Sequence, residues 1–188
     1  MNWRNNAQRY GALSIGFHWL MLVLIAAVYA SMELHDIFPR GSAERGAMMT
    51  WHYMLGLSVL VLAAARLVVR ASGPTPRIEP DPVAWQQLLA KLMHLALYAL
   101  MLGLPVAGWL TLSAQGKPIP FFGWQLPALL AENKNLAKSI KEVHETVASA
   151  GYFLIGLHAA AALYHHYVVR DNTLQRMLPG RKRTLTFR

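Results

Sequence analysis

The chain has 188 residues, of which 55% are hydrophobic and only 14% are charged, and its formal net charge is +9 at pH 7. So few charges exclude an ordinary soluble surface, and several apolar runs are long enough to cross a bilayer core of about 30 Å. The absence of cysteine excludes disulfides, thiolate metal sites, cysteine-ligated iron–sulfur clusters and the covalent attachment of c-type haem.

Four uncharged runs along the chain predict four membrane-spanning helices, because an α-helix needs about 20 residues to cross the hydrocarbon core. Between the second and third runs, residues 72–82 contain four prolines and predict a loop. A longer polar link, residues 117–145, joins the third run to the fourth. The predicted fold class is all-α, an integral membrane four-helix bundle in a single domain, 1–188. The spans are expected at about residues 11–32, 47–65, 92–116 and 146–169.

The basic residues are distributed unevenly between the two sides of these spans. The N-terminal tail, the second link and the C-terminal tail together hold 12 Lys and Arg, whereas the first and third links hold 6. The positive-inside rule therefore predicts that both termini are cytoplasmic. The basic residues form no patch interleaved with aromatics, so no nucleic-acid partner is expected. A cleavable signal peptide is the alternative for the first run, which follows Arg4 and Arg9, but the run is long and contains His18.

Seven of the eight histidines fall in or beside the predicted spans. An ionisable side chain at membrane depth is costly, so each is a functional candidate. For any single histidine the alternative is an interhelical hydrogen bond or an interfacial position at a helix end. The seven are His18, His52, His94, His144, His158, His165 and His166.

The spacing of these histidines predicts two sites at two depths. His144 and His158 are 14 residues apart, so they lie about 40° apart on one helix face and about 21 Å apart along its axis. In the expected topology the depth of each residue pairs His18 with His158 on the cytoplasmic side and His52 with His144 on the periplasmic side. Two such pairs suit two haems, whose iron takes two axial ligands, better than structural zinc, which usually takes four.

Other residues near these pairs leave alternatives open. His94 lies on the cytoplasmic side of the third span, where it could replace His18 or His158 as a ligand or serve a substrate site. Arg66 and Arg70 can anchor the second span to the headgroups, with a haem propionate as the alternative partner of Arg66. Four glycines would let a flat macrocycle approach the backbone or would allow close helix packing; they are Gly16, Gly56, Gly151 and Gly156.

Several motifs of the chain together resemble the bacterial cytochrome b561 family. They are IGFHW at 15–19, WH at 51–52, HET at 144–146, HAAAALYHH at 158–166 and DNTLQRM at 171–177, and the last two are the most specific. The resemblance covers nearly the whole chain. It implies a multi-pass protein of the bacterial inner membrane that binds two haem b. The implied axial ligands are His18, His52, His144 and His158, the same four residues that the topology pairs.

Within that family the chain is most similar to the superoxide oxidases. The similarity implies an enzyme that oxidises periplasmic superoxide to dioxygen at the haems and reduces ubiquinone. Quinone reduction needs protons, for which His94, His165 and Asp171 are candidates; their alternative role is hydrogen bonding at a helix end. Four lysines of the third link could steer the superoxide anion or could be solvated loop charges; they are Lys117, Lys134, Lys138 and Lys141.

Two other functions compete with this interpretation. The chain could be a cytochrome b subunit that passes electrons between a partner dehydrogenase or hydrogenase and quinone, with a redox partner subunit and no substrate chemistry of its own. A histidine-lined metal-ion transporter would need charged ligands near mid-membrane, and the sequence places no acidic residue at that depth.

Overall fold

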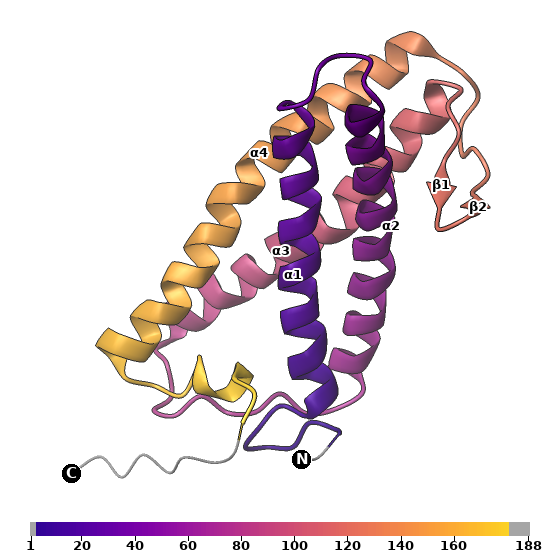
Figure 1. Ribbon diagram of the computed structural model, residues 1–188. Helices are drawn as coiled ribbons and strands as arrows, with labels where there is room; N and C mark the ends of the chain where they lie inside the picture. The colour runs from indigo at the N-terminus through magenta and orange to yellow at the C-terminus, as the bar shows by residue number, and fades with distance from the viewer. Residues whose placement is uncertain (1–2, 181–188) are drawn as a thin grey trace.

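Four long helices form the molecule in the computed structural model, which describes residues 3–180 (Figure 1). All four are long and apolar enough to cross a membrane, which confirms the prediction of an all-α protein with four candidate spans. The helices are α1 (Ala12–His35), α2 (Ala43–Ala71), α3 (Ala84–Ala114) and α4 (Lys134–Tyr164).

Three helices begin earlier than the apolar runs: α3 begins at Ala84 without a side-chain cap, whereas polar residues cap α2 and α4. The hydroxyl of Ser42 accepts a hydrogen bond from the backbone N–H of Arg45 at 3.2 Å, so α2 begins at Ala43. The amide oxygen of Asn133 accepts from the N–H of Leu136 at 3.0 Å and starts α4 at Lys134. Residues 134–145 of the polar link are therefore helical, and α4 extends beyond its apolar part.

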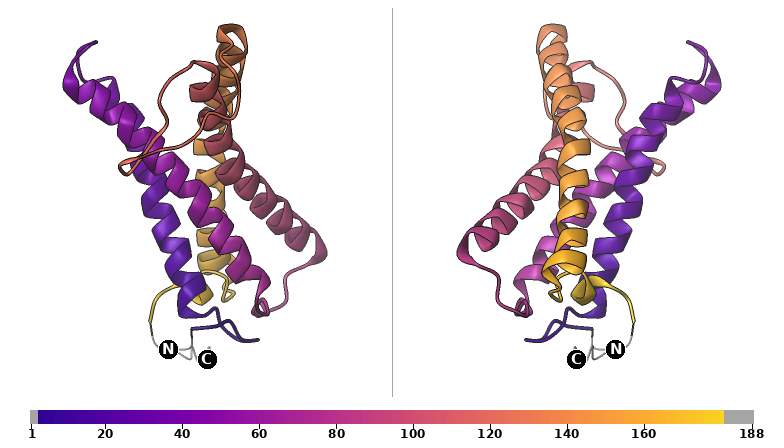
Figure 2. Two further views of the ribbon diagram at one scale, coloured as in Figure 1. Left: turned by 90° about the vertical axis from the view of Figure 1, so that its right-hand side faces the viewer. Right: turned by 90° about the vertical axis from the view of Figure 1, so that its left-hand side faces the viewer.

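Consecutive helices pack against each other, α1 on α2, α2 on α3 and α3 on α4. One buried cluster lies where the first three helices meet and includes Met21, Ala63 and Met101. Figure 2 shows that α1 and α2 lean away from α3 and α4 toward the end that carries residues 36–42 and 115–133. Many large apolar side chains on the helices remain exposed, as a lipid-facing surface requires.

The third link contains a short hairpin of β1 (Pro120–Phe121) and β2 (Trp124–Gln125), which are antiparallel. Its turn residues Phe122 and Gly123 both have positive φ, 46° and 88°, the backbone that a two-residue hairpin turn requires. The hairpin directs Ile119 inward, where it packs against Leu57 of α2 and Leu112 of α3. The link thus closes one end of the bundle with an apolar side chain.

At the opposite end, three segments that are distant in sequence meet (Figure 1). The N–H of Arg77, in the second link, donates to the carbonyl of Ala7 at 3.1 Å. Asn172, after α4, exchanges two hydrogen bonds with Glu79, at 3.2 and 3.1 Å. The segments before α1 and after α4 therefore lie at the same end. The basic residues at 181–183 and 188, which contribute to the predicted orientation, lie outside the described residues.

Candidate functional site

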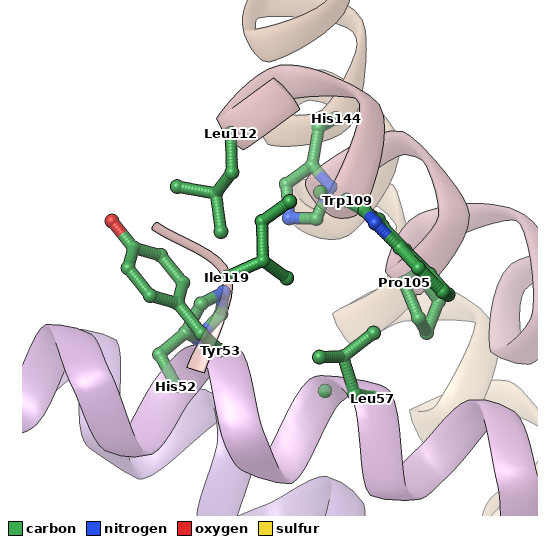
Figure 3. A pocket seen from close by; sticks show the side chains of 10 residues that line it. His52, Tyr53, Leu57, Pro105, Trp109, Leu112, Ile119 and His144 are labelled. Atoms are coloured by element: carbon green, nitrogen blue, oxygen red, sulfur yellow. The ribbon is translucent and has the colours of Figure 1, made fainter. Parts of the chain in front are cut away.

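The structure brings together His52 of α2 and His144 of α4 near the end of the bundle that carries the first and third links. Their ring centroids are 6.2 Å apart and their planes are inclined by 74°. The two rings border a small open-sided pocket (Figure 3). The other lining residues are Tyr53, Gly56, Leu57, Pro105, Gly108, Trp109, Leu112 and Ile119. The cavity is thus almost entirely apolar and aromatic apart from the two imidazoles.

A second group of histidines lies nearer the other end of the bundle. The ring centroids of His18 of α1 and His158 of α4 are 6.3 Å apart, again with planes inclined by 74°. His94 of α3 is also close, with its centroid 5.8 Å from that of His158. Both pairs that the sequence predicts are therefore brought together. Following the topology expected from the sequence, we call His52 and His144 the outer pair and His18 and His158 the inner pair, and His94 lies beside the inner pair.

The geometry of the two pairs fits bis-histidine coordination of a haem iron. An iron atom about 2 Å from each ligating nitrogen places the two imidazole centroids about 6 Å apart. In the outer pair, Nδ1 of His52 lies 3.4 Å from the carbonyl oxygen of Val28 and 3.4 Å from the hydroxyl of Ser31, which already donates its proton to that carbonyl. Because a carbonyl only accepts, Nδ1 carries the proton and Nε2 keeps its lone pair for a metal. His52 and His144 can therefore hold one haem.

The inner group offers two arrangements. Nδ1 of His94 lies 2.6 Å from the carbonyl oxygen of Ala90, so its Nε2 is also free to ligate a metal or to accept a proton. Nδ1 of His18 instead lies 3.1 Å from Nη1 of Arg66. Both His18 and His94 lie at about the centroid distance of an axial pair from His158, at 6.3 and 5.8 Å, and His94 has the more typical hydrogen bond of a ligand. The predicted alternative for His94 thus stays open.

The four glycines singled out in the sequence divide into two kinds. A Cβ atom added at Gly16, Gly56 or Gly156 would have no neighbouring atom within 4 Å, so these positions leave space beside the helix. A Cβ added at Gly151 would lie 2.3 Å from the hydroxyl oxygen of Tyr29. Gly151 therefore serves close packing between α4 and α1, where the Tyr29 hydroxyl donates to the carbonyl of Ala148 at 2.8 Å.

His165 and Asp171 form a hydrogen-bonded pair at the inner end of α4. Nδ1 of His165 lies 2.6 Å from Oδ2 of Asp171, whose side chain is buried. The other carboxylate oxygen accepts from the N–H of Thr173 at 2.8 Å. A π-helical turn, His165–Val169, followed by Arg170 with a left-handed φ of 62°, bends the chain back so that the two side chains meet. The sequence had no signal for this turn.

Three of the four candidate steering lysines lie on the first turns of α4 and not in a loop. Lys138 lies 3.9 Å from Glu142, and Lys141 lies 2.6 Å from Glu145, each one helical turn further on. In these ion pairs the carboxylates partly cancel the positive electrostatic potential of Lys138 and Lys141. At the same end of the bundle, a hydrogen bond from His35 and a weaker effect of one from Arg45 lower the pKa of Asp36, so this carboxylate stays ionised. Lys117 and Lys134 have no carboxylate within 4.0 Å among residues 3–180.

Two features of the site were not found from the sequence. The apolar side chain of Ile119 reaches into the outer cavity from a link that looks only polar in the sequence. The contact between Arg66 and His18 joins helices whose relative rotation the sequence does not specify. Within the described residues, no three His, Cys, Asp or Glu side chains are grouped to hold a bare metal ion.

Comparison with known proteins shows the family of the chain. Residues 9–180 match the family described as prokaryotic cytochrome b561. The chain is 42% identical to cytochrome b561 homolog 1 of Escherichia coli K12 over 93% of its length and 99% of that protein. It is 38% identical to the probable superoxide oxidase CybB of Yersinia pestis, over 93% and 98% of the two chains. It is 32% identical to cytochrome b561 homolog 2 of E. coli K12, over 95% of both. The chain therefore belongs to the prokaryotic cytochrome b561 family and is a bacterial membrane protein that binds haem b.

Proposed function

We propose that this chain is a superoxide oxidase of the bacterial inner membrane, with both termini in the cytoplasm and two haem b groups at two depths. Two superoxide anions each give up one electron and leave as dioxygen, and one ubiquinone takes up the two electrons with two protons and becomes ubiquinol. The observation that carries the proposal is the presence of two facing histidine pairs, His52 with His144 and His18 with His158, at the two levels of α4.

The two levels give electrons a route across the membrane core. When bound, each haem supplies one-electron exchange between the ferric and ferrous states of its iron. His144 and His158 hold the two levels on a single rigid helix, 14 residues and so about 21 Å apart along its axis. His18 of α1 and His52 of α2 are the partners of these two histidines. The relative from Y. pestis, whose name states superoxide oxidase, supports this activity.

The outer end of the chain would receive superoxide. Ile119 and Leu112 cover the cavity beside His52 and His144 with apolar surface, which limits the approach of bulk water. Superoxide is small enough to approach the rim, and oxidation by electron transfer needs no nucleophile or general base from the protein. Lys117 and Lys134 have no carboxylate partner among the described residues, so they are better placed to attract an anion than the paired Lys138 and Lys141.

The inner end would bind ubiquinone and supply its protons. Asp171 fixes the ring of His165 through Nδ1, so that Nε2 is the nitrogen that can pass a proton to a quinone oxygen. His94 is the second candidate, because its Nδ1 hydrogen bond to Ala90 leaves Nε2 free and its ring lies beside that of His158. If His18 and His158 are the axial pair, His94 is free to serve the substrate.

The proposal is tested with the purified, haem-loaded chain in liposomes that contain ubiquinone. Superoxide is generated enzymatically outside, and ubiquinol is measured with and without superoxide dismutase. We expect one ubiquinol for every two superoxide anions consumed, and we expect dismutase to abolish its formation. If both haems stay oxidised under superoxide and are reduced only when a dehydrogenase or hydrogenase is added, the chain is an electron-transfer subunit.

A further inference from the structure

Arg66 has the same position relative to His52 on α2 as His158 has relative to His144 on α4. His158 follows His144 by 14 residues, and Arg66 follows His52 by the same number. On a helix this separation keeps two residues within about 40° of each other and about 21 Å apart in depth. Arg66 therefore lies on the face of α2 that carries His52, at the level of the inner histidines. The contact of 3.1 Å between Arg66 and His18 confirms that level.

The contact with His18 is not compatible with ligation through Nε2 of a neutral ring. A guanidinium only donates hydrogen bonds, so Nδ1 of His18 must accept from Arg66. The proton of neutral His18 is then on Nε2, which has no lone pair left for iron. If His18 becomes an axial ligand, its Nδ1 must carry the proton, and Arg66 must take another partner.

An anion at this depth would stabilise the charge of Arg66. Among residues 3–180, no carboxylate lies within 4.0 Å of its guanidinium. A cation inside a membrane bundle is costly unless an opposite charge accompanies it. Haem b carries two propionates, and the planar guanidinium binds a carboxylate through two parallel hydrogen bonds.

We propose that Arg66 is the counter-ion of an inner-haem propionate, and that it exchanges His18 for this carboxylate when the haem binds. The inference rests on the inner haem of the proposed function but does not depend on superoxide or ubiquinone as substrates. A fixed positive charge beside the macrocycle favours the ferrous form, which has one positive charge less than the ferric form. Arg66 therefore raises the midpoint potential of the inner haem relative to a chain without this charge.

The test compares Arg66→Gln with Arg66→Lys and with Arg70→Gln in the purified holoprotein. Gln removes the charge and keeps hydrogen-bond donors, whereas Lys keeps the charge. Arg70→Gln makes the same charge change one helical turn further along α2, at an exposed position. Each variant is titrated optically to obtain the midpoint potentials, and haem per chain is measured by pyridine haemochrome. Repeating the titration in a His144→Ala background isolates the inner haem.

We expect Arg66→Gln to lower the potential of the inner haem alone, with little change in Arg66→Lys and Arg70→Gln. Loss of one haem in Arg66→Gln, with both haems retained in Arg66→Lys, also supports the assignment. Two haems with unchanged potentials in Arg66→Gln would overturn it and leave Arg66 as a lipid anchor. If Arg66→Lys also loses the inner haem, a positive charge alone is not sufficient at this position, and the assignment of Arg66 as a counter-ion is overturned. A wild-type chain with two haems that superoxide leaves oxidised would contradict the proposed function and not this inference.

Discussion

The imidazoles of His52 and His144 face each other across the gap between α2 and α4, with their centroids 6.2 Å apart. The same distance within 0.1 Å separates His18 from His158 at the other level. The centroid distance of both pairs is close to the value of about 6 Å that bis-histidine ligation of one iron requires. Each pair joins α4 to one of the first two helices, so the bundle is organised around the two levels of α4.

Replacement of His144 by Ala should remove the outer haem and leave the inner one. The variant loses one axial ligand of the outer pair, while His18, His94 and His158 lie one level away. The haem content per chain, measured by pyridine haemochrome, should then fall to about half of the wild-type value. His166→Ala is the matched control, because His166 lies beyond the C-terminal end of α4 and is in neither histidine pair. Two haems in the His144 variant would remove His144 from the ligand set.

Replacement of Asp171 by Asn should slow the reduction of ubiquinone without loss of haem. The amide can no longer hold His165 through a charge-assisted bond, which is 2.6 Å long in the native pair. A positioned proton donor typically contributes 10²–10⁴ in rate, so we expect the quinone rate to fall by at least about tenfold. His165→Gln should have the same effect, and the haems should still be reduced promptly by superoxide. An unchanged quinone rate in both variants would exclude this pair from proton transfer.

Attraction of superoxide by lysines should depend on salt. The Debye length shortens from about 30 Å at 0.01 M to about 8 Å at 0.15 M ionic strength, so steering weakens as salt is added. At low salt we expect Lys134→Gln to reduce the rate of haem reduction by superoxide about two- to fivefold. Lys138→Gln serves as the control because Glu142 already pairs with this lysine. A rate that is independent of ionic strength would show that the lysines do not steer.

Replacement of Gly151 by Ala should destabilise the bundle. Its Cβ would lie 2.3 Å from the Tyr29 hydroxyl and 2.9 Å from Cδ1 of Leu100. Overpacking of this kind costs about 1–3 kcal/mol, more than the gain of about 1 kcal/mol in helix propensity. Gly103→Ala is the control, because its Cβ would meet no atom within 4 Å. The apparent Tm in detergent should fall for Gly151→Ala only.

The sequence predicted those parts of the fold that depend on one helix at a time. Apolar runs of sufficient length predict spans, and a helix of fixed pitch places His144 and His158 on one face. Alternating chain direction then matches each of them in depth with a histidine on α1 or α2. The structure places the members of both pairs opposite each other.

The remaining features depend on local caps and turns and on contacts between elements, and hydrophobic periodicity encodes none of these. The cap at Asn133 extends α4 into the predicted polar link, and the π turn after Tyr164 brings His165 to Asp171. The position of Ile119 follows from a two-residue hairpin turn in which Phe122, a residue not typical of positive φ, takes part. The backbone conformation at these turns also depends on packing against neighbouring helices.

The proposed electron route depends on two haem b groups per chain, each held between two imidazoles. The most direct measurement is pyridine haemochrome quantification of the purified wild-type protein, combined with electron paramagnetic resonance of its oxidised form. We predict two b-type haems per chain, both low-spin ferric with signals typical of bis-imidazole ligation. One haem per chain, or a high-spin signal of five-coordinate iron at full haem loading, would contradict the account.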